Sequence, residues 1–482
     1  MSTQNQHKSL VLALLISIFL TKNCADSDDQ TECLSETKHP YMNFATKTPY
    51  YHAHGNIREE LSTLQSSGCD VHSVWMMVRH GSRHPTKIDG SFIRHHLPLL
   101  RKKLVNAYHH GLGSLCRKDL ELLKEWDPDK LSHDRRMQLF ETGRVEMKEL
   151  GARVREALPH FFKEGVLEHN VSIWSTNTDR TKETAKVFLE GFSPSQNLEK
   201  NIVVKEHDRI MEFHEICHKY NEKIFNGSHI PAFLKFLKGP ELLSVVGSVS
   251  ERIAVPVERL HVVLMYNACR YYKVMEPLKH SAWCAVFSRK DMEVMEFGED
   301  LFVYHDHGYA LDITYEQACP AVQDLLQRFR YQSDSSVFYF THLETVVKVM
   351  TRFGFFNDSK PLTWNAMDSR RRWRTSDFGG FGSNIAFLLT KCRDVGYGCE
   401  IRVCGSCHIR MRWTVNTYIN EKKVHLPRCA YTTGCPWLVF QQLYGQYAVC
   451  PFDELCGNKG FGSKVVSEQW KFWRKLNILR EL

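Results

Sequence analysis

The sequence predicts an α/β protein in which a mainly parallel sheet is flanked by helices and carries an inserted, mostly helical domain. Three short segments that we interpret as buried strands carry this prediction: the apolar runs 74–78 and 337–340, and the segment 171–175. Each segment leads into a polar loop, and each loop leads into a helical pattern. Short apolar runs bounded by turn signals are typical of strands buried on both faces. Parallel strands gather the loops at their carboxyl ends along one edge of the sheet, where α/β proteins bind ligands.

The amino terminus has the pattern of a secretory signal over residues 1–25. Lys8 supplies a positive charge, residues 10–20 form an apolar run, and Ala25 is a small residue at a cleavage position. The run is too short to span a bilayer comfortably, and no later stretch reaches the roughly 20 apolar residues of a membrane helix. We therefore expect a protein that is secreted or held in the secretory-pathway lumen, the ER lumen included, and that requires no membrane association.

Cysteine usage agrees with export. Of 16 cysteines, 15 follow Cys24 at scattered positions, which predicts disulfides formed in an oxidising compartment. Because that number is odd, at least one thiol is free or joined to another chain. A Cys-x-x-Cys-His pattern at 404–408 is open to haem, redox or zinc interpretations, and we favour local disulfides. Three sequons are candidate glycosylation sites: Asn170, Asn226 and Asn357.

Composition places few limits on function. The chain has 482 residues, of which 43% are hydrophobic and 24% charged, as in ordinary globular proteins with a sizeable core. The formal charge of +8 falls to +6 without Lys8 and Lys22. This mild excess suits a small anionic substrate. Nothing in the sequence indicates a nucleic-acid partner.

The first loop follows the run 74–78 and holds the densest group of chemically active side chains. Arg79 and Arg83 bracket His80 and Gly81, and Pro85 ends the turn. Guanidinium groups bind phosphate oxygens two at a time, and glycine lets the backbone turn tightly beside the imidazole. The positive field of the arginines should lower the pKa of His80 and keep the imidazole neutral. A basic surface loop with an incidental histidine is the alternative, and we favour a catalytic loop.

The other two loops add candidate partners for His80. Arg180 begins the helix after the segment 171–175, where it either binds an anion or makes a local ion pair. We expect this helix to end at Gly191, a residue suited to a left-handed terminus. His342 and Glu344 follow the run 337–340. His-x-Glu is weak evidence by itself and becomes strong evidence beside the His80 loop.

The order of these patterns predicts how the chain is divided. Residues 26–204 form the first part of the α/β core, with a helical excursion over 92–162. Residues 205–300 form the inserted helical domain, and residues 301–482 complete the core with further strands at 384–389 and 411–419. The triplet 305–307, His-Asp-His, has a metal-like composition, but we interpret it as part of a polar loop.

The motif Arg79-His80-Gly81-Ser82-Arg83-His84-Pro85 resembles the signature of the histidine acid phosphatases, a branch of the histidine phosphatase superfamily. His342-Leu343-Glu344 resembles the His-Ala-Glu of the multiple inositol polyphosphate phosphatases within that family. It departs from that pattern at Leu343, and Thr341 replaces a usual glycine. Segments at 212–217, 281–284, 435–437 and 450–453 are similar to the same branch, so the likeness spans roughly 40–460.

The resemblance implies an enzyme that removes phosphate from inositol polyphosphates, including inositol hexakisphosphate, through a phosphohistidine, without a metal or organic cofactor. Simple phosphate esters and 2,3-bisphosphoglycerate are additional candidate substrates. The departures at Thr341 and Leu343 leave open a broad secreted acid phosphatase or an inactive homologue that binds a phosphate ligand. The implied roles are His80 as nucleophile, Glu344 as proton donor, and Arg79, Arg83, Arg180 and His342 as phosphate ligands. Beside phosphate, the carboxyl of Glu344 should have a raised pKa.

Overall fold

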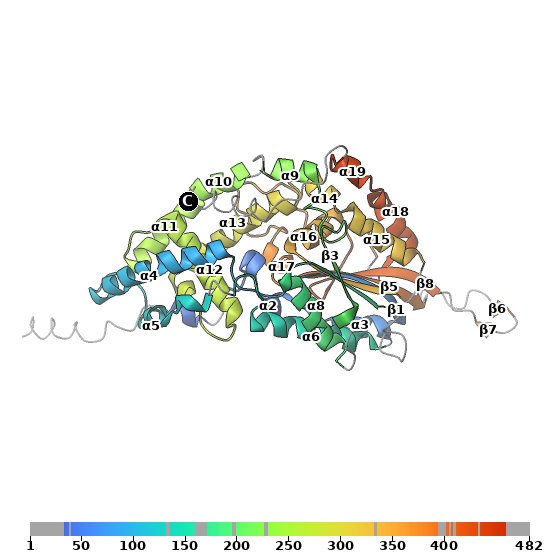
Figure 1. Cartoon of the computed structure of the whole chain (residues 1–482), viewed down its shortest axis with the longest axis horizontal. Coiled ribbons are helices and arrows are strands. Elements are labelled where there is room, and N and C mark those ends of the chain that lie inside the picture. Colours follow the sequence, from blue (N-terminus) through green and yellow to red (C-terminus); the bar gives the residue numbers. More distant parts are fainter. Residues whose placement is uncertain are drawn as a thin grey trace, which may run out of the picture.

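The fold is described from a computed structural model of the chain (Figure 1). The structure describes residues 33–37, 40–131, 135–159, 171–194, 199–225, 230–331, 335–393, 402–403, 406–407, 411–431 and 434–458. The expected signal at 1–25 and the Cys-x-x-Cys-His pattern at 404–408 lie wholly or largely outside these residues, as do Asn170 and Asn226. The third sequon residue, Asn357, is described and exposed.

A central sheet carries the fold, with its strands in the order β10-β8-β5-β1-β4-β2-β3 and β9 paired to β8. Its strands are β1 Cys69–Arg79, β2 Val171–Thr176, β3 Ile202–Lys205, β4 Ser336–Thr341, β5 Asn384–Arg393, β8 Met411–Ile419, β9 Lys422–Val424 and β10 Cys435–Pro436. The pairs β1–β4, β4–β2 and β2–β3 are parallel, as predicted. The pairs made by β5, β8, β9 and β10 are antiparallel, so the sheet is mixed.

Helices cover both faces of the sheet, and side chains alternate between the two layers. Along β1, Val74, Met76 and Val78 join an apolar cluster with α3, α6 and α8, whereas Trp75 and Met77 belong to the cluster on the other face. Figure 1 shows α3, α6 and α8 on one side of the sheet and α15, α16 and α18 on the other. Burial on both faces explains why these strands are nearly continuous apolar runs.

A helical region lies beside the sheet and arches over one end of it (Figure 1). It includes residues of the predicted insertion as well as α4 and α5, and its helices share one apolar cluster with the sheet. The helices are α2 Tyr50–Ala53, α3 Ile57–Ser66, α4 Lys87–His109, α5 Arg117–Glu125, α6 Glu141–Ala157, α8 Asp179–Phe192, α9 His218–Phe225, α10 Ile230–Lys238, α11 Pro240–Ile253, α12 Arg259–Met275, α13 Arg289–His307, α14 Asp312–Glu316, α15 Cys319–Arg330, α16 Leu343–Arg352, α17 Thr375–Phe378, α18 Trp437–Tyr444 and α19 Phe452–Leu455.

Two local predictions are wrong. Gly191 does not terminate its helix but lies inside α8, where a Cβ atom would stand 1.9 Å from the carbonyl oxygen of Lys148 on α6. The glycine is therefore needed for the close approach of two helices, a tertiary requirement. The triplet 305–307 is not a loop but the last turn of α13, and it is largely buried.

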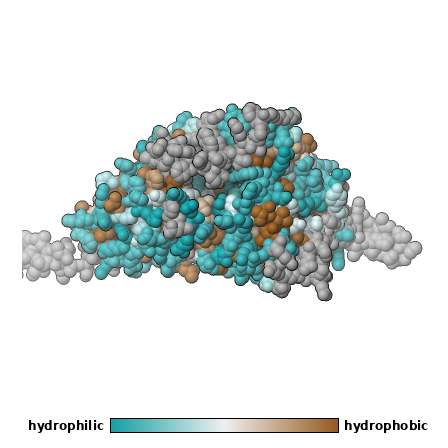
Figure 2. All heavy atoms as spheres, viewed as in Figure 1, coloured by the Kyte–Doolittle hydropathy of each residue, from teal (hydrophilic) through white to brown (hydrophobic). Residues whose placement is uncertain are grey.

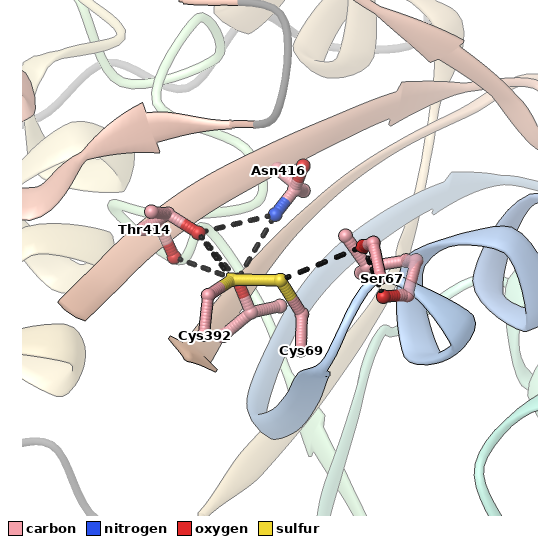
Figure 3. The surroundings of a disulfide bond; sticks show 7 residues. Ser67, Cys69, Cys392, Thr414 and Asn416 are labelled. Carbon is pink, nitrogen blue, oxygen red and sulfur yellow. Dashed lines mark hydrogen bonds between the residues drawn. A yellow bond between two sulfur atoms is a disulfide. The ribbon is translucent and has the colours of Figure 1, made fainter. Parts of the chain in front are cut away.

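Six disulfides join described residues: Cys33–Cys116, Cys69–Cys392, Cys217–Cys456, Cys269–Cys284, Cys319–Cys450 and Cys429–Cys435. Figure 3 shows the second of these between neighbouring strands β1 and β5, with Ser67 and Thr414 beside its sulfur atoms. It lies at the opposite end of β1 from His80 and ties together residues 323 positions apart in sequence. Such a crosslink restricts the unfolded chain and so favours the folded one.

The face seen in Figure 2 is mainly hydrophilic, with hydrophobic residues scattered among polar ones. Within the described part of the chain, none of the helices combines the length and apolarity needed to cross a bilayer.

Candidate active site

The His80 loop lies at the carboxyl end of β1 and is fixed by backbone contacts on three sides. The amide of His80 donates to the carbonyl of Thr341 at 3.0 Å, which joins it to the end of β4. The amide of Gly81 donates to Thr184 Oγ1 on α8 at 3.1 Å. A Cβ atom on Gly81 would stand 2.8 Å from the carbonyl oxygen of Gly143, so glycine allows the loop to rest on α6.

The imidazole of His80 is held with one nitrogen available for attack. It is 4% exposed, and its Nδ1 lies 3.0 Å from the carbonyl oxygen of Gly81. A carbonyl only accepts hydrogen bonds, so Nδ1 carries the proton and Nε2 has the lone pair. Burial, the charges of Arg180, Arg79 and Arg83, and His342 lower the pKa of His80 well below its usual value. The ring is therefore a neutral nucleophile across the physiological pH range.

Arg79 and Arg83 bring two guanidinium groups to the same loop. Nη1 of Arg79 donates to the carbonyls of Thr46 at 2.5 Å and Gly379 at 2.8 Å, and both guanidiniums lie against the ring of Phe381. Burial and the charge of Arg83 lower the pKa of Arg79 to about 9, which leaves it charged at neutral pH. The Nε atoms of both arginines are buried without an acceptor among the described residues, so these charged donors are not fully satisfied by protein groups.

Arg180 and His342 meet from the two other loops. Arg180, in the first turn of α8, donates from Nη2 to His342 Nδ1 at 3.3 Å. Because guanidinium is only a donor, the proton of a neutral His342 is on Nε2, 3.2 Å from the hydroxyl of Thr176. The rings of His342 and His80 are 5.8 Å apart between centroids. Residues from β1, α8 and the end of β4 thus converge on one site, as the sequence predicts.

Two helices also begin at this edge. α8 follows Thr178, and α16 follows His342, which occupies the N-cap position. Amino termini of helices present free N–H groups and a partial positive charge, which favours bound anions. Together with the three arginines, they make this edge of the sheet strongly attractive to phosphate.

Glu344 lies in the first turn of α16 and is surrounded by imidazoles. Burial raises its pKa, but the positive charge that His307, His214 and His342 carry when protonated acts in the opposite direction, and where these rings are charged it outweighs burial and holds the pKa well below its usual range. The raised pKa that we expected from the sequence concerns the carboxyl beside bound phosphate, so it stays a prediction, and the histidines are neighbours that this expectation did not consider. Bound phosphate would act in the opposite direction to these rings.

The two departures from the family pattern have structural explanations. Thr341 Oγ1 donates to the carbonyl of Met211 at 2.7 Å and so anchors the segment that carries His214. The side chain of Leu343 packs against the main apolar cluster and would lie 3.4 Å from a Cβ atom on Gly379. Neither residue prevents Glu344 from occupying the first turn of α16.

Sequence reasoning missed several side chains of this site. Thr176 and Glu212 both approach Nε2 of His342, at 3.2 and 3.8 Å. His214 and His307 act on Glu344, and Lys348 binds His307. His214 was visible within the segment 212–217, and His307 within the triplet 305–307, but only the fold brings them to Glu344.

Glu212, which approaches His342, also belongs to a group of described residues that has the composition of a metal site. His207, Glu212 and Glu215 each place a ligand atom within 4.8 Å of the others. Nδ1 of His207 lies 3.5 Å from Glu215, and the backbone N–H of His207 donates to Glu212. The cluster is therefore internally paired.

A neutral imidazole with a free Nε2 near three guanidiniums, at the sheet edge where α16 presents the carboxyl group of Glu344, is suited to phosphoryl transfer onto histidine. The family comparison agrees: residues 70–404, more than half of the chain, match the model of the histidine phosphatase superfamily (branch 2). The chain belongs to this family. It is a phosphoric monoester hydrolase by class.

The chain is also similar to individual members. It is 25% identical over 396 residues to the multiple inositol polyphosphate phosphatase 1 of Drosophila melanogaster, covering 79% of this chain and 83% of the relative. It is 26% identical over 431 residues to the protein of that name from Homo sapiens, covering 80% of this chain and 84% of the relative. Phytase A of Emericella nidulans is 19% identical over 420 residues, covering 77% and 83%.

Solved structures share the fold. The crystal structure of the phytase from D. castellii matches 84% of this chain and 85% of its own with a TM-score of 0.64 and 14% identity. The multiple inositol polyphosphate phosphatase of Bifidobacterium longum, in complex with inositol hexasulfate, matches 81% and 94% with a TM-score of 0.60 and 13% identity. The predicted α/β class with flanking helices is confirmed.

Proposed function

We propose that this protein hydrolyses inositol polyphosphates, including inositol hexakisphosphate, through a phosphohistidine formed at His80. The observation that carries the proposal is the neutral imidazole of His80, with its free Nε2 among Arg79, Arg83 and Arg180. The names of the relatives support the substrate class. A second candidate is a broad acid phosphatase, because two acid phosphatases of Schizosaccharomyces pombe are 22% and 24% identical to the chain.

In the first step Nε2 of His80 attacks phosphorus, a P–N bond forms, and the P–O bond to the leaving alkoxide breaks. Glu344 donates its proton to that alkoxide. The guanidiniums and His342 stabilise the negative charge on the transferring group. In the second step Glu344 accepts a proton from water, whose oxygen attacks phosphorus and breaks the P–N bond. Phosphate leaves, and both side chains regain their starting protonation states.

The test is phosphate release from inositol hexakisphosphate between mildly acidic and neutral pH, with His80→Ala as the control. Release that requires His80, with an acid-labile phosphohistidine trapped during turnover, would support the proposal. The same assay with 2,3-bisphosphoglycerate would extend or narrow the substrate class. Turnover of a simple aryl phosphate alone would favour the broad acid phosphatase. Binding of inositol hexakisphosphate without any turnover would favour an inactive ligand-binding homologue.

We further propose a secretory route, with residues 1–25 as its signal and Asn357 as a glycan acceptor. The six disulfides and the exposure of Asn357 support it. We also propose that the chain is divided into two segments of the α/β core, 26–204 and 301–482, with the helical insertion 205–300 between them. Enzymatic deglycosylation of the protein from a secreting eukaryotic host would test the sequons, since an unchanged mass would count against them.

A further inference from the structure

α16 carries a buried lysine one turn after Glu344. The side chain of Lys348 is fully buried, with 0% of the residue exposed. Its Nζ lies 3.0 Å from the hydroxyl of Tyr220, 3.0 Å from the carbonyl of Asp306 and 2.9 Å from Nδ1 of His307. The ring of Tyr220 also faces the ammonium at 4.4 Å. Residues four apart on a helix share a face, so Lys348 and Glu344 face the same region.

These three contacts define the proton positions. A buried ammonium is costly unless its protons are hydrogen-bonded, and Lys348 has one acceptor for each of its three protons. The bond to His307 therefore requires a lone pair at Nδ1, which places the proton of the neutral ring on Nε2. Adding a second proton at Nδ1 would set two donors against each other at 2.9 Å. While Lys348 is charged, His307 stays neutral.

The charge of His307 matters because of what Glu344 has to do. An imidazolium beside a carboxyl group favours the ionised carboxylate and so removes the proton that a leaving alkoxide needs. Among the imidazoles around Glu344, His307 has the largest effect, ahead of His214 and His342. Arg79, at the end of β1, also interacts electrostatically with Glu344. His307 itself is faced by the carboxylate of Asp306, 3.7 Å from Nε2, which would stabilise an imidazolium if Nδ1 were free.

We propose that Lys348 is a positioning residue for the acid–base carboxyl of Glu344, because its ammonium holds His307 in the Nε2–H tautomer and keeps that ring uncharged. This inference rests on the proposed function, since it takes Glu344 as the proton donor. Lys348 acts through His307 and touches neither substrate nor phosphate.

The test compares kcat across pH for the unmodified protein and Lys348→Met, which keeps most of the length of the side chain and removes its ammonium group. In the variant, Nδ1 of His307 is free to accept a proton. At the alkaline limb of the profile, kcat falls because Glu344 has lost its proton. That limb should move to lower pH by about one unit, because a charged His307 favours the ionised carboxylate. Lys273→Met is the matched control. Lys273 lies on α12 and donates to the carbonyls of Pro277 and Lys279, which follow that helix. This variant should leave the profile unchanged.

The same Lys348→Met substitution in a His307→Gln variant distinguishes an effect through His307 from a general disturbance of the structure. In His307→Gln no ring is available to gain charge, so adding Lys348→Met should cause no further shift of the limb. A folded Lys348→Met protein with an unshifted limb would overturn the proposal. The same shift in the His307→Gln background would also overturn it.

A measurement on the unmodified chain covers the case in which Lys348→Met does not fold. Nitrogen chemical shifts of ring-labelled histidine should show His307 neutral with its proton on Nε2 at neutral pH, and a proton on Nδ1 would overturn the proposal. This readout needs no turnover. A protein without phosphatase activity would refute the proposed function, while the tautomer of His307 would still decide the role of Lys348.

Discussion

The two halves of the site differ in what controls their protons. His80 is buried beside guanidiniums, which keep their charge at all physiological pH values, so burial and permanent charges together keep it neutral. The charges that lower the pKa of Glu344 belong to imidazoles, a kind of side chain that can gain or lose its charge near physiological pH unless a neighbouring donor blocks it. The difference teaches that the nucleophile is kept neutral by burial and permanent charges, whereas the acid depends on neighbours that can titrate. We therefore expect the pH dependence of turnover to originate in the Glu344 half.

The largest loss of turnover is expected from His80→Ala, which removes the nucleophile. Without Nε2 no P–N bond forms, and we expect kcat for inositol hexakisphosphate to fall by at least about 10,000-fold. Phosphate release is the assay, and added imidazole should restore part of the turnover by acting as an external nucleophile. Wild-type rates in a folded variant would remove His80 from its role.

On the acid side, Glu344→Gln removes the proton donor and leaves His80 intact. We expect kcat for inositol hexakisphosphate to fall by about 1,000-fold, because an alkoxide leaves poorly without a proton. An aryl phosphate with an acidic leaving group needs little protonation, so its phosphorylation step should be nearly unaffected. Burst kinetics with the aryl substrate measure that step, and an equal loss for both substrates would argue against a proton donor.

Arg180 links the halves, since it lowers the pKa of His80 and binds His342. For Arg180→Gln we expect kcat/KM to fall by about 100-fold, from the loss of charged donors to the transition state. Lys182→Gln, two residues along α8 and paired with Asp179 on the surface, is the control and should stay near wild type. Similar losses in both variants would point to net charge rather than to phosphate contacts.

The smallest expected effect concerns the pH dependence of the unfolding free energy, through Glu146, which contacts the His80 loop at Ser82. Glu146 on α6 accepts hydrogen bonds from Ser82 Oγ at 2.9 Å and from the amide of Tyr51 at 3.2 Å, and burial raises its pKa to about 7. A raised carboxyl pKa stabilises the fold at low pH. That contribution is present below about pH 4.5 and is lost as the pH rises through 7, to the extent of about 3 kcal/mol.

Glu146→Gln mimics the protonated form, so it should flatten the pH dependence of the unfolding free energy between pH 4.5 and 7. Denaturant unfolding at several pH values measures this. Glu156→Gln lies on the exposed side of the same helix and should leave the slope unchanged. A slope that survives in Glu146→Gln would assign the titration to another group.

The sequence by itself determined the parts of this protein that depend on contiguous residues. The buried strands were readable because strands covered on both faces need nearly unbroken apolar runs, and β1 and β4 confirm this. The loops after them carried His80, Arg180 and His342 within a few residues of each strand end. Parallel pairing then required those loops to meet at one edge.

Only the tertiary structure decided what depends on residues distant in sequence. Gly191 gave a sound local signal for a helix end, but the close approach of α6 required a glycine inside α8. The sequence identified Glu344 as a candidate proton donor, but only the fold shows that His214 and His307 act on its pKa. Nothing in the sequence indicated a role for Lys348, whose three acceptors come from α9 and the end of α13. Secondary structure follows from residues that are neighbours in sequence. The charge state of a side chain depends on the groups that pack against it, and these come from distant parts of the chain.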